Sequence, residues 1–342
     1  MADLATRATN VKCLESAGVL DLLRPLLSDG CSTVRQCAVM AAARLAEHDE
    51  SVAQQLLSSG MLTITIENLN KFNVYYKRSA LYLIRAIAKH NEDLASTIVR
   101  LGALEHIVSC LEDFDTQRST LCALGAVAGA RAALGEAVVA GGALPPALLH
   151  AGHDTAPVRR AAACLLRDIV KHSVDLAQLV VNTGGCGPLV ELLSESTGGT
   201  RVPACMALGY IAGQSDQLAM AVIEAKAVVV LVEILQNNGD DADLCAAAWT
   251  LGHIAKHSPQ HSLAIAVANA LPRLLQLYTN PKSSGEVKAR SLCALKQSLQ
   301  CCLHRPALEP LLHAAPACVL KYVLAQYAKV LSLFLNYKIV LI

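Results

Sequence analysis

Three histidines, His253, His257 and His261, are spaced four residues apart. On one continuous helix this spacing would place the imidazoles along a single face, where they could bind a metal ion such as zinc. However, Pro259 stands between the last two and would break the helix before His261. A metal site is therefore the weaker interpretation, and we expect no metal.

A glycine-rich segment, TGGCG at 183–187, resembles a phosphate-binding loop. No Lys-Ser or Lys-Thr pair follows it, and it lies at a boundary between the repeats described below. The sequence also lacks the GxSxG, HExxH and dinucleotide-binding patterns. We therefore expect no enzymatic activity, no cofactor and no small-molecule substrate.

The composition of the chain favours helices as the elements that position these residues. Of the 342 residues, 54% are hydrophobic but only 4% are aromatic, so Ala, Leu and Val supply most of the apolar surface. Sheet proteins are instead enriched in aromatic and β-branched residues. The formal net charge of +1 argues against a nucleic-acid partner bound through the whole surface, although local basic stripes remain possible.

The cysteines and the apolar segments indicate the compartment. There are 13 cysteines and no CxxC pair, and most stand among small apolar residues, which predicts buried free thiols in a reducing environment. Every stretch of 18 residues that is otherwise apolar contains a charged residue, a glycine or a proline. Asp3 and Arg7 stand at the N-terminus before any apolar region, which a signal peptide would need there. We therefore expect a soluble, cytoplasmic protein with no signal peptide and no membrane partner.

An internal repeat of about 42 residues runs through the sequence. The segments 87–99 and 169–181 share Lys-His and Asp-Leu-Ala in the same register. Two markers recur at steps of 40 to 43 residues. The first, which we call the histidine column, is His48, His90, Ala130, His172, Gln214 and His257. The second is Gly18, Gly60, Gly102, Gly142, Gly185, Lys226 and Asn269.

Each repeat contains three helix signals. SVDLAQLVVNTGG predicts a short amphipathic helix ended by glycine, and GPLVELLSES predicts a second helix with Pro188 in its first turn. GTRVPACMALGYIAGQ predicts a longer third helix whose first turn is interrupted or shortened by Pro203. Three helices per repeat predict an all-α fold, a right-handed armadillo-repeat α-solenoid whose stacked units share one core. AAAWTLGHIAKH closely resembles the armadillo third-helix pattern.

The period predicts the domain organisation. We expect a partial repeat at 1–17, six complete repeats over 18–268, a looser seventh at 269–310, and capping helices with an apolar tail at 311–342. The segment SLFLNYKIVLI at 332–342 is so apolar that it would promote association if exposed. It therefore either packs on the last repeat or marks a chain cut short.

The third helices of armadillo proteins line a concave groove, and importin- and catenin-type members hold an extended peptide there with a ladder of Asn residues. In this chain the matching column, four residues before the histidine column, contains no Asn: it reads Arg44, Ala86, Ala126, Asp168, Tyr210 and His253. A generic reader of extended peptides is therefore disfavoured, and we expect side chains to bind a shaped protein surface. The predicted groove contacts are Arg44, Arg85, Asp168, Tyr210 and His253.

Cations gather near the start of the predicted third helices, where the helix dipole disfavours them. The fold gains nothing obvious from this placement. We call these residues the basic stripe: Arg35, Lys77, Arg78, Arg118, Arg159, Arg160 and Arg201. The stripe is either a contact for an acidic partner or a solvated face with local ion pairs. Likewise, the Lys-His pairs at the ends of third helices either favour the helix dipole or form a shared partner contact.

Several segments resemble a particular group of armadillo proteins. LEDFD (111–115), KHSVDLAQLVVNTGG (171–185), ALGYIAGQSDQLAMAVI (207–223), ALPRLLQLY (270–278) and PALEPLLHAAP (306–316) are similar to the armadillo-repeat family of the axonemal central apparatus. The resemblance extends over nearly the whole chain, to about residue 331, while 116–160 diverges and 332–342 does not resemble the family's C-terminal tail. Family members are longer.

The resemblance implies a non-enzymatic scaffold on a central-pair microtubule of cilia or flagella, with tubulin or other central-apparatus proteins as partners, that supports motility. It implies a location in the cytoskeleton of the axoneme and brings no catalytic residues with it. The alternative is a soluble adaptor of the catenin or importin type that binds linear peptides as cargo or in signalling.

Overall fold

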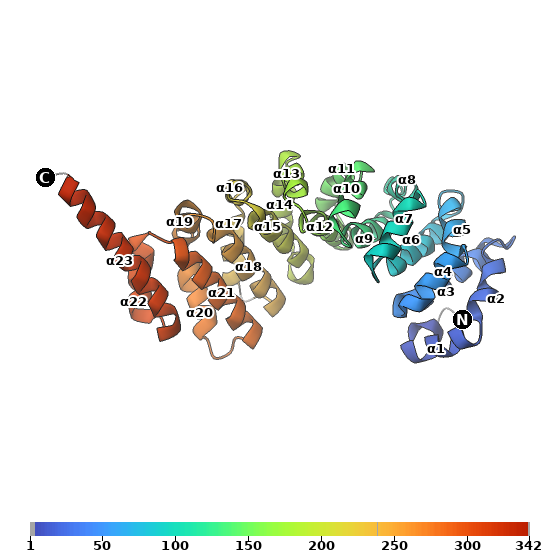
Figure 1. Ribbon diagram of the computed structural model, residues 1–342, viewed down its shortest axis with the longest axis horizontal. Helices are drawn as coiled ribbons and strands as arrows, with labels where there is room; N and C mark the ends of the chain where they lie inside the picture. The colour runs from blue at the N-terminus through green and yellow to red at the C-terminus, as the bar shows by residue number, and fades with distance from the viewer. Residues whose placement is uncertain (1–3, 238, 341–342) are drawn as a thin grey trace. The chain divides into compact units, whose positions relative to one another are not determined.

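The computed structural model describes residues 4–237 and 239–340, and within them every regular element is a helix. By its internal contacts the chain divides into two compact units, 1–172 and 173–342, which we call unit 1 and unit 2. Each unit is built from triplets of two short helices followed by a longer one (Figure 1). The predicted all-α, three-helix repeat is therefore confirmed.

Unit 1 contains four triplets after a short 3-10 turn at Leu4–Thr6. The first two are α1 (Ala8–Ser16), α2 (Val19–Leu26), α3 (Ser32–His48), α4 (Glu50–Ser58), α5 (Met61–Glu67) and α6 (Val74–Ala88). The next two are α7 (Glu92–Arg100), α8 (Ala103–Ser109), α9 (Gln117–Ala128), α10 (Ala132–Ala140), α11 (Leu144–Ala151) and α12 (Ala156–Val170).

Unit 2 contains three triplets and a final helix pair. The triplets are α13 (Val174–Asn182), α14 (Cys186–Glu195), α15 (Val202–Gln214), α16 (Asp216–Glu224), α17 (Ala227–Gln236), α18 (Asp241–Ala255), α19 (Pro259–Val267), α20 (Ala270–Thr279) and α21 (Gly285–Cys301), with a 3-10 turn at Gly198–Thr200. The pair is α22 (Arg305–Ala314) and α23 (Ala317–Val340). The repeats predicted at 18–268 and 269–310 have the same period as these triplets, but each predicted repeat begins at the second helix of a triplet instead of the first. Of the predicted tail, the side chains of 333–342 lie outside the described residues.

The turn between the first and second helices explains the second sequence marker. Six of the seven marker residues adopt the left-handed backbone conformation there, including Lys226 with φ 64° and Asn269 with φ 58°. In the fifth repeat the residue with positive φ is Gly184, at 78°, one place before the predicted Gly185. Glycine adopts this conformation without steric cost, which is why it leads this column.

Side-chain caps start several of the helices. Asp49, Asn91, Ser173 and Ser215 each accept a backbone N–H from the first turn of the helix that follows them. Such a cap contributes about 1 kcal/mol to helix stability. Pro203 lies in the first turn of α15, as predicted, and Pro259 begins α19 after α18 has ended at Ala255.

The core of each unit lies mainly between successive third helices. In unit 1, α3, α6, α9 and α12 pack in that order, and in unit 2 α15 packs on α18 and α18 on α21. Their facing side chains are chiefly Ala, Leu and Ile, such as Leu83, Ile87, Leu165 and Leu208, all fully buried. Small side chains allow the close helix packing that the composition predicted.

Two further sequence expectations concern cysteines and membranes. All described cysteines are free, but the prediction of burial is wrong for five that are exposed: Cys13, Cys31, Cys37, Cys293 and Cys318. Within the described residues no single helix is both long and apolar enough to cross a bilayer. Two bent pairs, α10 with α11 and α13 with α14, reach that length and apolarity only when taken together.

Candidate interaction surfaces on the third helices

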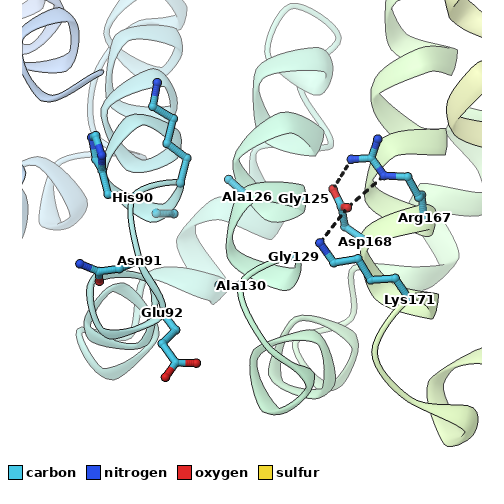
Figure 2. A pocket seen from close by; sticks show the side chains of 12 residues that line it. His90, Asn91, Glu92, Gly125, Ala126, Gly129, Ala130, Arg167, Asp168 and Lys171 are labelled. Carbon is cyan, nitrogen blue, oxygen red and sulfur yellow. Dashed lines mark hydrogen bonds and ion pairs between the residues drawn. The ribbon is translucent and has the colours of Figure 1, made fainter. Parts of the chain in front are cut away.

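A polar hollow of about 380 Å³ opens in unit 1 where the end of α9 and the turn after it carry small residues, Gly125, Ala126, Gly129 and Ala130. Figure 2 shows these residues between the end of α6 on one side and α12 on the other. We call it the ion-pair hollow, because its α12 wall carries Asp168 between two cations. Arg167 donates to both carboxylate oxygens of Asp168, at 3.0 and 2.8 Å, and Lys171 Nζ lies 3.4 Å away.

A second hollow of unit 1, about 310 Å³, lies on α3, α6 and α9. It is lined by Met40, Tyr82, Arg78, Arg85 and Arg118, with Ser119 and Cys122, and we call it the arginine hollow. The Tyr82 hydroxyl donates to the Glu47 carboxylate, which also pairs with Lys89 at 3.2 Å. This bond to Glu47 fixes the tyrosine ring at the side of the hollow.

Unit 2 has a hollow of about 710 Å³ on α15, α18 and α21, which we call the aromatic hollow. It is lined by Val202, Met206, Tyr210, Asp241, Ala242, Cys245, Ala246, Trp249, Glu286 and Arg290. The rings of Tyr210 and Trp249 meet edge to face, with centroids 5.1 Å apart, and His253 lies 4.3 Å beyond Trp249.

Glycines of α15 make room for this aromatic cluster. A Cβ on Gly209 would lie 2.3 Å from the Trp249 indole, and one on Gly213 would lie 2.9 Å from the His253 ring. Trp249 and His253 can therefore lie directly against the preceding helix. Burial there lowers the pKa of His253 to about 4, helped by the nearby charges of Lys256 and His257. The ring is consequently neutral at physiological pH.

The predicted groove residues are divided between the two units. Arg44, Arg85 and Asp168 belong to unit 1, where Asp168 is buried in its ion pairs and Arg85 is exposed. Tyr210 and His253 belong to unit 2, on either side of Trp249. Their role in binding stays a prediction. Sequence reasoning left out Trp249, although it is the only tryptophan of the chain and stands within the armadillo-like segment AAAWTLGHIAKH.

The cations of the basic stripe have intramolecular partners that the sequence did not reveal. Arg35 donates to the carbonyl of Asp29 and stacks over the Phe72 ring, 4.1 Å from its centroid. Arg159 makes the equivalent contact one hundred and twenty-four residues later, with the carbonyls of His153 and Asp154 at 2.8 and 3.1 Å. Both side chains thereby hold the loop that precedes their own helix. The statement that the fold gains nothing from this placement is wrong.

The other stripe cations divide into paired and exposed ones. Lys77 pairs with Asp113 at 3.2 Å, and Arg78 donates to the backbone and side chain of Asp115. Arg201 lies 3.3 Å from Asp243, whose pKa is nevertheless raised because burial outweighs the guanidinium. Arg118 and Arg160 are exposed. The role of the basic stripe as a partner contact therefore remains a prediction, and Arg118 and Arg160 are the two members most accessible to a partner.

Three histidines of the histidine column form hydrogen bonds between consecutive third helices. The imidazole Nε2 of His172 bonds the Gly129 carbonyl at 3.0 Å, and that of His257 bonds the Ala212 carbonyl at 2.6 Å. His90 makes the same bond to Ala46. Each acceptor lies near the end of the preceding third helix, so the recurring histidine has a structural role beyond the helix dipole.

The lysine before each histidine also contacts the preceding third helix or its own. Lys256 Nζ donates to the Gly213 carbonyl at 2.9 Å, Lys89 pairs with Glu47, and Lys171 pairs with Asp168. Two of the three histidines considered for metal binding are engaged by carbonyls, because His261 bonds the Asp216 carbonyl at 2.9 Å as His257 bonds that of Ala212. Among the residues that the structure describes, no group of three or more His, Cys, Asp or Glu could hold a metal ion.

The arrangement of helix triplets has counterparts in solved structures. A crystal structure of an engineered protein superposes with a TM-score of 0.82 at 24% identity, covering 94% of this chain and 81% of its own. A designed armadillo repeat protein in complex with the peptide (KR)4 superposes with a TM-score of 0.65 at 23% identity, covering 69% and 99%. The chain therefore folds as an armadillo-repeat α-solenoid.

Among natural proteins, the chain is similar to Sperm-associated antigen 6 of Mus musculus, at 39% identity over 80 residues, and of Homo sapiens, at 38% over 80 residues. The matched stretch is 23% of this chain and 16% of either relative. It is thus much shorter than the near-complete resemblance expected from the sequence. No protein-family model matches the chain.

Proposed function

We propose that this chain is a non-enzymatic protein–protein interaction scaffold of the axonemal central apparatus. There it supports the structural integrity of the central pair and the motility of cilia or flagella. The observation that carries the proposal is the similarity to Sperm-associated antigen 6 in a chain whose third helices carry hollows lined by charged and aromatic side chains. Its partners are tubulin or other central-apparatus proteins.

The location is tested by expressing a tagged copy in a ciliated cell. We expect the tag along the axoneme, retained after detergent removes the membrane and the soluble contents. A tagged designed armadillo repeat protein of similar length, expressed in the same cells, controls for passive entry into the cilium. A tag that washes out together with this control would contradict the axonemal proposal.

The basic stripe is the proposed microtubule contact, and the exposed Arg118 and Arg160 test it best. Reversal to Glu at both positions should reduce co-sedimentation with microtubules, because acidic tubulin tails would then meet like charges. Arg35 and Arg159 are unsuitable for this test, since they hold loops of their own repeats. Unchanged co-sedimentation of the double variant would discard the stripe but not the scaffold.

A second candidate function is a soluble adaptor that binds linear peptides, and the aromatic hollow favours it. The faces of Trp249 and Tyr210 and the carboxylates of Asp241 and Glu286 together suit a cationic side chain of a partner. Binding of a labelled (KR)4 peptide, measured by fluorescence anisotropy, would support this function if Trp249→Ala weakens it. The absence of binding by the wild-type chain would count against it.

A further inference from the structure

The arginine hollow of unit 1 carries three guanidinium groups and no carboxylate. Arg78 and Arg85 come from α6 and Arg118 from α9, while none of the described side chains that line the hollow is Asp or Glu. Three like charges in one small hollow repel one another. Arg78 is paired with Asp115, outside the lining, whereas Arg85 and Arg118 have no carboxylate partner among the described residues.

The hydrogen bonds of the three arginines show which of the side chains are available to bind a ligand. Arg78 already donates to Asp115 at 2.7 and 2.8 Å. Arg85 and Arg118 are exposed, and the guanidinium group of neither makes a hydrogen bond or ion pair with any residue that the structure describes. Each therefore offers its planar fork of N–H donors, the geometry that binds a carboxylate through two parallel hydrogen bonds.

The other two hollows differ in this respect. In the ion-pair hollow, Asp168 already occupies the space between Arg167 and Lys171. In the aromatic hollow, Asp241 and Glu286 outnumber Arg290. Charge complementarity therefore separates the arginine hollow from both of them as a receptor for negative charge.

We propose that the arginine hollow binds an acidic polypeptide segment, with one carboxylate on Arg85 and another on Arg118. This rests on the proposed protein-binding function and specifies the chemistry of one partner. Met40 and the ring of Tyr82 line the same hollow and would contact the aliphatic parts of the segment. With a formal net charge of only +1, the chain lacks the broad basic surface that retains nucleic acid at physiological salt.

The test uses the full chain and a fluorescein-labelled decamer of glutamate, with binding followed by anisotropy at about 0.15 M salt. The variant is Arg85→Glu/Arg118→Glu. The matched control is Arg100→Glu/Arg131→Glu, which makes the same change in net charge at exposed sites at the end of α7 and just before α10. Thermal melts of all three proteins verify that they fold.

We expect the Kd for the glutamate peptide to rise at least tenfold in the hollow variant and less than threefold in the control. Equal losses in both variants, or no binding by the wild-type chain, would overturn the proposal. A single-stranded DNA decamer that binds more tightly than the peptide and depends on the same two arginines would also overturn it. Axonemal localisation is measured separately, so the scaffold proposal can survive the failure of this one.

Discussion

Unit 1 and unit 2 differ at one position of their third helices. Five residues before the histidine column, unit 1 has Ala43, Arg85, Gly125 and Arg167, whereas unit 2 has glycine at both places, Gly209 and Gly252. The arginines give unit 1 a charged surface with an arginine hollow. The glycines let the larger residues of the next helix approach closely, so Trp249 packs over Gly209. The repeat thus fixes where a side chain stands, and the residue type decides the chemistry of the surface.

The largest expected effect separates Gly209 of unit 2 from Gly125, which holds the same repeat position in unit 1. Gly209→Ala places a methyl group 2.3 Å from the indole of Trp249, which must then leave its site. We expect a loss of about 3 kcal/mol in the free energy of unfolding, in the range of an overpacked core. Urea titration followed by the fluorescence of Trp249, the only tryptophan, reports the loss in unit 2.

Gly125→Ala is the matched control in unit 1. Its Cβ would lie 3.6 Å from the Leu165 Cα, an ordinary contact. Because alanine also favours helices, we expect no loss and a gain of up to about 1 kcal/mol in unfolding free energy, measured by circular dichroism. Similar losses for the two substitutions would show that the glycines do not distinguish the two units.

The next effect is a pH dependence of unit 2 due to His253. Its pKa is about 4 in the folded chain and about 6.5 when unfolded, so the unfolded state binds the proton more readily. The stabilising contribution is complete above pH 6.5 and is lost as the pH falls towards 4. After allowance for partial exposure, we expect a loss of about 2 kcal/mol in unfolding free energy over this window.

His253→Gln cannot take up this proton and serves as the reference. Urea titrations at several pH values between 7 and 4, again followed by Trp249 fluorescence, should give a steeper fall for the wild-type chain than for the variant. Parallel curves for the two proteins would mean that His253 titrates alike in the folded and unfolded states.

A charge swap tests the contrast between the two hollows through binding. Asp241→Lys/Glu286→Lys should weaken the binding of (KR)4 about tenfold, because two favourable charges become repulsive, and should leave the glutamate decamer unaffected. Arg85→Glu/Arg118→Glu should have the reverse selectivity. Anisotropy titrations of both peptides against both variants measure the four values. If each variant alters both peptides equally, the two hollows are not separate sites.

The sequence predicted the parts of the fold that depend on local backbone chemistry. Periodic glycines marked the left-handed turns, and Pro259 marked the end of one helix and the start of the next. The fifth turn was misplaced by one residue because Gly184 and Gly185 are adjacent and either could adopt positive φ. Local sequence alone could not choose between them.

The surfaces were predicted less well because they depend on tertiary contacts. Nothing local shows that the Arg35 guanidinium turns back onto the Asp29 carbonyl and the Phe72 ring. The groove prediction used essentially one position per repeat, whereas each hollow combines several positions from neighbouring third helices. Trp249 was therefore passed over, although Tyr210 beside it was included.

The smallest effect concerns a feature that the two units share. His172→Ala in unit 1 and His257→Ala in unit 2 each remove a bond to a carbonyl of the preceding third helix. We expect each to lower the unfolding free energy by about 1 kcal/mol, the usual contribution of one hydrogen bond. Urea titrations followed by circular dichroism for unit 1 and by Trp249 fluorescence for unit 2 measure both.

His48 occupies the same column and ends α3, but it is exposed and has no side-chain hydrogen bond with the part of the chain that the structure describes. His48→Ala removes an imidazole at the same place near a helix end but no bond between helices, so we expect a change below about 0.5 kcal/mol. A loss as large as that of His172→Ala would assign the effect of the column to the helix dipole. A smaller loss assigns it to the bonds between successive third helices, which then stabilise the charged and the aromatic unit alike.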